Sequence, residues 1–271
     1  MFEPVSAKNP LFGDLRRLSR RRSARLDQGR FLVEGATLIE VALDSGASLT
    51  HLLHDGGRPL VDADSALAVR VEATSARLIE VPDGVLARIT DTVTSPPLAA
   101  VVERRPSTLE AVLADGAPTL PVLVLVDVSD PGNAGTLLRS AEAAGVAAVV
   151  FCSGSVDPFN PKTVRSSAGS LFLVPIVEGV DPTIVLAALG DAGVQRVGTV
   201  ARSGRPLDQA SLDRPLAIVL GSEAHGLPAG LAAGLDELVT IPMSGRAESL
   251  NVAMAGTLVV FEAARQRRLR P

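Results

Sequence analysis

The sequence predicts an α/β protein whose C-terminal part is built on a mostly parallel β-sheet, with a smaller α/β unit before it. Short apolar runs alternate with amphipathic segments along almost the whole chain, which is the pattern of βαβ units. The run Val122–Val128 is continuously apolar, as expected for a strand buried on both faces of a sheet. A chain of 271 residues, 46% of them hydrophobic, is long enough for one or two such domains.

The first part of the chain is expected to form a small domain over residues 1–105, followed by a linker over 106–120. Residues 1–10 read as an unstructured lead. An arginine-rich helix is expected from 11 to about 27, because leucines recur there at helical spacing. Those leucines are Leu11, Leu15, Leu18 and Leu26. The pattern then predicts strands at 31–33, 49–53, 66–71 and 98–103, and helical segments at 35–43, 74–80 and 85–89.

Residues 121–271 are predicted to form the second domain. Strands are expected at 122–128, 146–151, 172–177, 196–201, 216–221 and 237–243, and helices at 135–144, 162–171, 182–189 and from about 250 onward. In the last helix the small residues Ala253, Ala255 and Gly256 would let another backbone approach closely. Taken alone, this segment is an ordinary C-terminal helix capped by Ser249 or Asn251.

The charge distribution is uneven. A net charge of −4 argues against a nucleic-acid-binding protein, but arginines are concentrated near the N-terminus. They are Arg16, Arg17, Arg20, Arg21, Arg22, Arg25 and Arg30. Such a cluster is typical of phosphate contact, and a solvated helix face explains it equally well. Trp and Tyr are absent, so any contact with RNA would depend on charge and shape more than on stacking.

Cysteine and histidine usage limits the chemistry. The single Cys152 excludes an internal disulfide and a cysteine-built zinc site, and it fits a reducing cytoplasm. The three histidines are too scattered to suggest a metal centre. The sequence shows no secretory signal and no apolar run of membrane-spanning length. We therefore expect a cytoplasmic protein without a metal or a membrane segment.

The turns after the predicted strands exclude several nucleotide-binding classes. The first long strand is followed by Asp-Pro-Gly-Asn-Ala-Gly at 130–135, which is not the Gly-x-Gly-x-x-Gly fingerprint. The next strand ends without an acidic residue that could hold a ribose. This speaks against a dinucleotide dehydrogenase and the common Rossmann-type methyltransferase. A Walker loop and a Gly-x-Ser-x-Gly elbow are also missing.

Three polar segments do follow predicted strands. They are Asn-x-Gly-x-x-x-Arg at 133–139, Gly-Ser-Glu-x-x-Gly at 221–226, and Ile-Pro-Met with Ser-Leu-Asn-Val between 241 and 252. In this order they resemble the three motifs of the SpoU (TrmH-type) RNA 2'-O-ribose methyltransferases of the SPOUT superfamily. The segments 31–35 and 89–96 resemble the ribosomal-protein-like RNA-binding domain of the two-domain members. The run 157–169 also matches the family, so the resemblance covers nearly the whole chain.

The resemblance implies a fold and a reaction. The C-terminal domain would contain a deep trefoil knot in which S-adenosylmethionine binds, and the protein would be a homodimer. The methyl group would be transferred to a ribose 2'-hydroxyl of RNA, and 23S-type ribosomal RNA is the expected substrate. Two alternatives stay open: a transfer-RNA methyltransferase of the same family, and a non-catalytic RNA-binding or ribosome-associated protein.

Site residues follow from the same resemblance. The cofactor-binding residues would be Thr199, Gly221, Ile241, Met243, Ser249 and Leu250. The catalytic residues would be Arg139, Asn133, Glu223, Ser249 and Asn251. The RNA-binding residues are expected from the pattern of positive charge and not from the resemblance: Arg16, Arg17, Arg20, Arg21, Arg22, Arg25, Lys162 and Arg165.

Arg139 has the principal role in the family pattern. Because a guanidinium stays protonated, we expect it to orient the adjacent phosphate and to stabilise negative charge that develops on the 2'-oxygen. Asn133 and Asn251 would position Arg139, and Glu223 would hold its guanidinium. For Lys162 and Arg165, phosphate contact and simple solvation of a helix are equally good interpretations.

Overall fold

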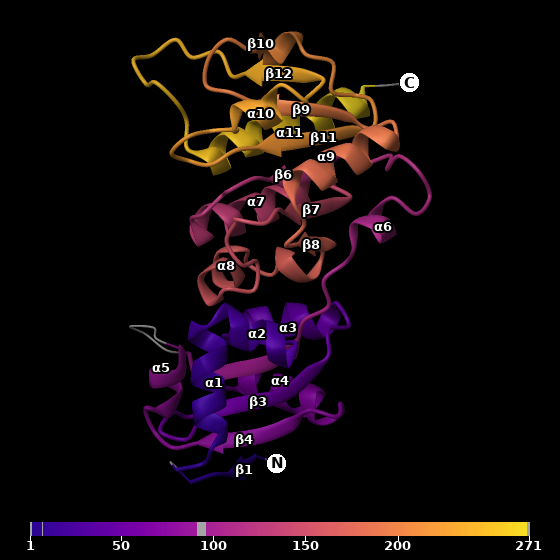
Figure 1. The fold of residues 1–271 in the computed structure, drawn as a ribbon. Helices are drawn as coiled ribbons and strands as arrows, with labels where there is room; N and C mark the ends of the chain where they lie inside the picture. The colour runs from indigo at the N-terminus through magenta and orange to yellow at the C-terminus, as the bar shows by residue number, and fades with distance from the viewer. Residues whose placement is uncertain (1, 7, 91–95, 270–271) are drawn as a thin grey trace. The chain divides into compact units, whose positions relative to one another are not determined.

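The structure is a computed structural model that describes residues 2–6, 8–90 and 96–269 (Figure 1). The chain divides into two compact units, each described here by itself. The first comprises Met1–Arg105 and Phe159–Phe172, and the second comprises Pro106–Pro158 and Leu173–Pro271. Residues 91–95 of the predicted motif at 89–96 lie outside the described residues.

The first unit is built on a five-stranded mixed sheet in the order β1-β4-β3-β5-β2. Its strands are β1 (Glu3–Pro4), β2 (Arg30–Glu34), β3 (Leu49–Asp55), β4 (Arg77–Val81) and β5 (Leu98–Glu103). β4 pairs parallel with β1 and β3, whereas β5 pairs antiparallel with β2 and β3. The helices are α1 (Leu11–Arg20), α2 (Arg22–Gln28), α3 (Ala36–Asp44), α4 (Asp62–Glu72), α5 (Val85–Thr90) and α8 (Pro161–Ser166), followed by the 3₁₀ turn η1 (Ser170–Phe172).

The predicted arginine-rich helix is interrupted. It forms α1 and α2, which are separated at Arg21, where the backbone is extended with φ −120° and ψ 120°. Arg25 is buried, and its guanidinium donates to the carbonyls of Leu18 (2.6 Å) and Ser19 (3.2 Å) at the end of α1. These carbonyls would otherwise lack partners at a helix end. Leu26, predicted to lie on the apolar stripe, is 50% exposed because the break turns it outward.

Three further predictions in the first unit are wrong. The supposed lead contains β1, which extends the sheet beside β4. The predicted strand at 66–71 is part of helix α4. A helix was predicted at 74–80, but residues 77–80 belong to strand β4. α4 buries Leu67, Ala68 and Val71 along one helical face. Short apolar runs like these cannot be assigned to helix or strand from their periodicity alone.

The segment 159–172 belongs to the first unit, although we expected all of 121–271 to form one domain. Phe31 of β2 lies 4.9 Å from Phe159 and 6.0 Å from Phe172, measured between ring centroids. The Arg104 guanidinium lies 4.6 Å from the centre of the Phe159 ring. A Cβ added at Gly169 would come within 2.9 Å of Val41, so this glycine lies tightly against α3. α8 packs against β2 in this way.

The second unit is a seven-stranded sheet in the order β10-β12-β9-β11-β6-β7-β8, with every described pairing parallel. Its strands are β6 (Val122–Leu125), β7 (Ala148–Phe151), β8 (Ile176–Glu178), β9 (Gln195–Thr199), β10 (Arg205–Pro206), β11 (Leu216–Leu220) and β12 (Glu237–Thr240). The helices are α6 (Leu109–Val112), α7 (Pro131–Ala144), α9 (Pro182–Asp191), α10 (Ala229–Ala232) and α11 (Val252–Arg268), with the 3₁₀ turn η2 (Leu207–Gln209). The predicted α/β class and parallel sheet are confirmed.

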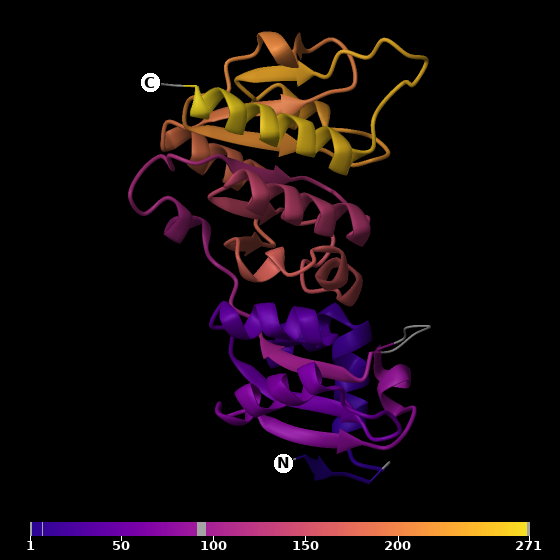
Figure 2. The same ribbon diagram turned by 180° about the vertical axis from the view of Figure 1, so that it is seen from behind.

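Helices cover both faces of this sheet. α7 and α11 lie side by side on one face, as Figure 2 shows, and α9 covers the other face in Figure 1. Under α9, a core of aliphatic side chains includes Val124, Val150, Leu189 and Val219. The predicted linker 106–120 is also packed here: α6 contributes the buried Leu109 to this core, so the linker is part of the second unit.

The helix after the first long strand begins earlier than predicted. α7 starts at Pro131, with Asp130 as its N-cap accepting a 2.8 Å hydrogen bond from the Asn133 N–H. An acidic cap followed by proline at the first helical position is a favoured start. Arg139 therefore lies in the third turn of the helix, about one turn further from its start than the predicted helix at 135–144 would place it.

Candidate active site

A cavity of about 600 Å³ lies where three neighbouring strands of the second unit end. The sheet order places β12, β9 and β11 side by side, and Thr199, Gly221 and Ile241 stand at or just beyond their carboxyl ends. This is where open parallel sheets bind ligands. The six predicted cofactor-binding residues all line this one cavity: Thr199, Gly221, Ile241, Met243, Ser249 and Leu250.

Several lining residues were not predicted from the sequence. Leu227 and Val239 supply apolar wall, and Ala255 and Val259 face the cavity from α11. Ala255 and Val259 are four residues apart and therefore share one helix face, a spacing that could have identified them. The lining thus combines apolar side chains with a few polar groups, as small-molecule sites usually do.

Gly221 shapes the cavity because no larger residue fits there. A Cβ at Gly221 would lie 2.2 Å from the carbonyl carbon of Gly226 and 2.4 Å from the backbone nitrogen of Leu227. The loop folds back on itself through the paired backbone hydrogen bonds between Ser222 and Gly226, of 3.1 and 2.8 Å. The contact is between two stretches of backbone, so a side chain could be accommodated only by moving the loop.

Three predicted catalytic residues form a hydrogen-bonded chain at the cavity edge. The Asn251 side-chain oxygen caps α11 by accepting the N–H groups of Ala253 (2.9 Å) and Met254 (3.3 Å). Its NH₂ group consequently donates to the Asn133 side-chain oxygen at 2.9 Å. The Asn133 NH₂ group then donates to Glu223 at 3.0 Å. Because the Asn251 oxygen caps α11, its NH₂ group must be the donor to Asn133, and this sets the direction of both hydrogen bonds that follow.

Glu223 connects this chain to the start of α7. Its carboxylate accepts the backbone N–H groups of Ser129 and Asp130, both at 3.3 Å. Burial raises the pKa of Glu223, but the hydrogen bonds from Asn133 and from backbone N–H groups outweigh that effect. The pKa therefore lies below its ordinary value. Glu223 is an ionised anchor that joins the three motif segments.

Arg139 takes no part in the hydrogen-bonded series Asn251–Asn133–Glu223. Its side chain is exposed on α7, and among the described residues it makes no hydrogen bond or ion pair. The prediction that Glu223 holds the Arg139 guanidinium differs from what is observed, because the Glu223 carboxylate binds Asn133 and backbone N–H groups instead. The three residues predicted to contact Arg139, namely Asn133, Asn251 and Glu223, are thus hydrogen-bonded to one another, and the Arg139 side chain is exposed to solvent.

The predicted RNA-binding residues separate into two groups. Arg25 is excluded from contact with RNA because it is 2% exposed and bound to the end of α1. The remaining members have exposed positions on the first unit: Arg16, Arg17, Arg20, Arg21, Arg22, Lys162 and Arg165. Lys162 and Arg165 do lie one turn apart on α8.

Within residues 2–6, 8–90 and 96–269, no group of three or more His, Cys, Asp or Glu side chains is arranged to hold a metal ion. No helix in the described part of the chain is long and apolar enough to cross a membrane.

Fold and site define a two-unit α/β protein with a ligand cavity at the carboxyl ends of parallel strands. Residues 121–261 match the SpoU rRNA Methylase family, and residues 9–100 match the MRM3-like substrate binding domain. The chain belongs to the SpoU rRNA methylase family, which confirms the resemblance seen in its motifs.

Relatives of full length support this assignment. The chain is 33% identical over 256 residues to the 23S rRNA (guanosine(2553)-2'-O)-methyltransferase RlmP of Bacillus subtilis, covering 94% of this chain and 96% of the relative. It is 33% identical to the 23S rRNA (uridine(2479)-2'-O)-methyltransferase of Streptomyces viridochromogenes, covering 97% and 92%. The crystal structure of an AdoMet-bound rRNA methyltransferase from Sinorhizobium meliloti matches with a TM-score of 0.87 and 30% identity, covering 100% and 99%.

Proposed function

We propose that this protein transfers a methyl group from S-adenosylmethionine to a ribose 2'-hydroxyl of ribosomal RNA of the 23S type. The observation that carries the proposal is the convergence of the three motif segments at one cavity. Glu223, Ser249 and Asn251 line it, and Asn133 is bonded to two of them. Membership of the SpoU family and the substrates named for its full-length relatives support the choice of RNA.

The cavity suits S-adenosylmethionine in size and in character. Its volume of about 600 Å³ is within the usual range for small-molecule sites. Ile241, Leu250 and Val259 offer apolar surface for an adenine ring, and Gly221 brings backbone polar groups to the wall. When bound, S-adenosylmethionine supplies an electrophilic methyl group on a positively charged sulfur.

The protein's own residues would orient the substrate and stabilise charge. The chain Glu223–Asn133–Asn251 holds the start of α7 beside the start of α11. Arg139, exposed on α7, would bind the RNA phosphate next to the reacting ribose. Its fixed positive charge would stabilise the 2'-oxygen as the hydroxyl proton leaves to solvent and the oxygen bonds to the methyl carbon. The bond between that carbon and sulfur would break at the same time, which leaves S-adenosylhomocysteine as a neutral product.

A homodimer is part of the proposal. α11 exposes an apolar stripe of Met254, Leu258 and Phe261, which are 63, 46 and 42% exposed. These positions follow each other by four and three residues and so share one helix face. An exposed stripe of this kind on an otherwise packed helix is typical of a protein interface.

The deep trefoil knot and a cytoplasmic location also belong to the proposal. α11 packs closely against its neighbours: a Cβ at Gly256 would come within 2.5 Å of Leu137 on α7 and Leu220 on β11. This tight packing is what a threaded helix requires. The cytoplasmic location is supported by the proposed ribosomal RNA substrate and by the single cysteine, Cys152, which is buried as a free thiol.

Mapping 2'-O-methyl positions on total RNA from cells with and without the protein tests the reaction. We expect one or more positions in large-subunit ribosomal RNA to lose methylation. A map that changes only in transfer RNA would point to the transfer-RNA alternative. An unchanged map, with no binding of S-adenosylmethionine by the purified protein, would refute the enzymatic function.

The role of Arg139 is tested by Arg139→Lys, which keeps the charge but loses the planar set of donors. We expect turnover to fall roughly a hundredfold, as when one donor to a developing oxyanion is removed, with cofactor affinity unchanged. Arg214→Lys, at an exposed position of the same unit, is the matched control. Near-normal turnover of Arg139→Lys would contradict the bidentate role.

A further inference from the structure

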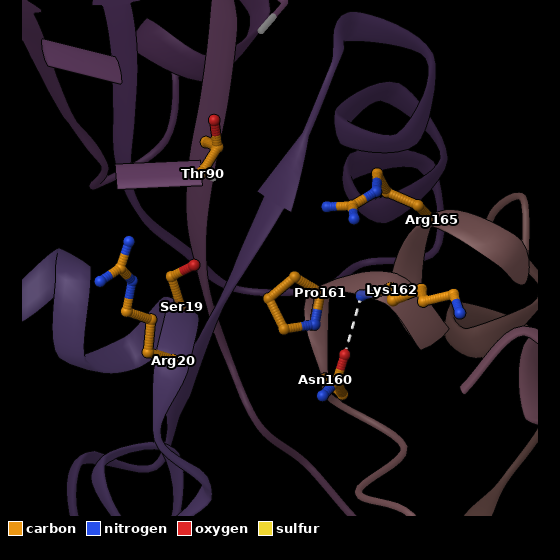
Figure 3. A pocket seen from close by; sticks show the side chains of 7 residues that line it. All are labelled: Ser19, Arg20, Thr90, Asn160, Pro161, Lys162 and Arg165. Carbon is orange, nitrogen blue, oxygen red and sulfur yellow. Dashed lines mark hydrogen bonds between the residues drawn. The ribbon is translucent and has the colours of Figure 1, made fainter. Parts of the chain in front are cut away.

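A basic pocket in the first unit takes no part in the reaction described above. It has a volume of about 450 Å³, and all its lining residues belong to that unit. Ser19 and Arg20, at the end of α1, and Thr90, at the end of α5, form part of the wall (Figure 3). The rest of the wall is formed by Asn160, Pro161, Lys162 and Arg165. The pocket thus joins helix ends of the N-terminal fold to the inserted segment 159–172.

Charge makes this pocket selective for anions. Three of its lining side chains are cationic, and none of its lining residues is acidic. Figure 3 shows Arg20 on one side and Lys162 and Arg165 on the other, with the Arg165 guanidinium turned toward the space between. Ser19 adds a hydroxyl group, which can donate to an oxyanion, whereas the Thr90 hydroxyl already donates to the Leu86 carbonyl at 3.0 Å. A phosphate group, with its several acceptor oxygens, matches this set of donors.

Arg165 is held in place by a buried carboxylate. Its Nη1 donates to Oε1 of Glu34 at 2.8 Å, and the Glu34 side chain is only 3% exposed. A guanidinium has five N–H donors in a rigid plane, so one bond to Glu34 fixes the plane and leaves further donors for a ligand. Glu34 is therefore a positioning residue for Arg165.

The surroundings favour a polyanion over a small phosphate compound. Arg20 is the last residue of α1, which also carries the exposed Arg16 and Arg17, and the exposed Arg21 and Arg22 follow directly. A mononucleotide or an inorganic phosphate ion would engage the pocket alone. An RNA strand could place one phosphate in the pocket and others along this series of arginines.

We infer that the pocket binds a backbone phosphate of the substrate RNA through Arg20, Lys162 and Arg165. This inference rests on the proposed function, because it places a phosphate of the RNA that the enzyme would methylate. It assigns the inserted segment 159–172 to substrate binding, although that segment lies within the stretch matched by the methylase family.

The test measures RNA affinity over a series of KCl concentrations, using the full-length protein and a large-subunit ribosomal RNA transcript. Wild type is compared with Arg20→Gln, Lys162→Gln and the double variant. Lys8→Gln and Arg70→Gln are the controls, because they remove the same charges from the same unit outside the pocket.

Each lost phosphate contact reduces counterion release. We expect the slope of log affinity against log salt to become shallower by roughly 0.7 for each single variant and by about twice that for the double variant. Affinity at low salt should fall several-fold, while both controls keep the wild-type slope. Cofactor affinity and the thermal midpoint should not change, because both substituted side chains have exposed positions.

Two results would overturn the inference: a wild-type slope in both pocket variants, or equal losses in pocket and control variants, which would show a net-charge effect. The proposed function is judged separately by cofactor binding and methyl transfer of the wild-type protein. A wild-type enzyme that methylates RNA, with pocket variants that bind RNA normally, would refute the pocket alone.

Discussion

Glu34 shows how a single residue combines burial, charge and position. Its Oε1 accepts a hydrogen bond from Arg165, whereas its Oε2 is buried with no hydrogen-bond partner among the described residues. Burial raises the pKa of the Glu34 carboxyl, and the charge and hydrogen bond of Arg165 offset this only in part. Keeping the Glu34 carboxylate ionised therefore costs folding stability, and in return the carboxylate fixes the orientation of the Arg165 guanidinium.

This raised pKa predicts a pH dependence. A carboxyl whose pKa is higher in the folded than in the unfolded state favours folding at low pH. That contribution is lost as the pH rises through the ordinary value of 4.5 and then through the raised folded-state pKa. Urea-unfolding midpoints of wild type should therefore fall relative to Glu34→Gln across this window. For Glu72→Gln, at an exposed position on α4, the urea-unfolding midpoint should depend on pH in the same way as for wild type. The same pH dependence in Glu34→Gln as in wild type would contradict the prediction.

At the scale of elements, the site depends on how loops close at strand ends. The loop after β11 folds back so tightly that the backbone at Gly221 touches the backbone at Gly226 and Leu227. The starts of α7 and α11 are joined through Asn133 and Asn251, and further along Ser140 and Thr257 share a 2.6 Å hydrogen bond. Two helices distant in sequence thus act as one support for the cavity.

Gly221→Ala tests the loop. The new Cβ would displace backbone, and overpacking of this kind costs about 1–3 kcal/mol. If the loop relieves this strain by leaving its cofactor-binding position, the cofactor must restore that position on binding, and its affinity would fall by up to roughly 5- to 150-fold. Isothermal titration with S-adenosylmethionine should show this loss. Gly245→Ala is the matched control, because a Cβ there would meet no atom within 4 Å. Equal affinities for the two variants would show that the loop can move aside.

At the scale of the whole molecule, assembly is decided by surfaces that folding leaves uncovered. In the second unit, Met254, Leu258 and Phe261 of α11 stay exposed, although the opposite face of the same helix buries Val259, Val260 and Ala263. Covering the exposed stripe with a second copy of the chain would remove its apolar area from water.

Leu258→Asp should therefore weaken or abolish the proposed homodimer, because a charge would have to be buried without a partner. Sedimentation velocity would show a shift toward the monomer, with an unchanged thermal midpoint for the folded chain at low concentration. Ile184→Asp is the control, since Ile184 is 59% exposed on α9 and lies outside the stripe. A dimer that survives Leu258→Asp would place the interface elsewhere.

Much of this protein could be predicted from the sequence because the relevant signals are local. The apolar run at 122–128, the proline and glycine turns and the ordered motifs predicted the parallel sheet, the family and six of the residues that line the cavity. The errors arose where local signals are ambiguous. The short apolar run at 66–71 fits either a strand or a helix, and the break at Arg21 depends on where the Arg25 side chain binds.

The sequence by itself determined the class of fold, the family and the residue types at the site, because these depend on periodicity and on motif order. Only the tertiary structure decided which polar groups meet. It paired Glu223 with Asn133 and not with Arg139, buried Arg25, and placed the segment 159–172 with the first unit. The reason is physical: hydrogen-bond partners and burial depend on contacts between segments far apart in the chain, which no local pattern specifies.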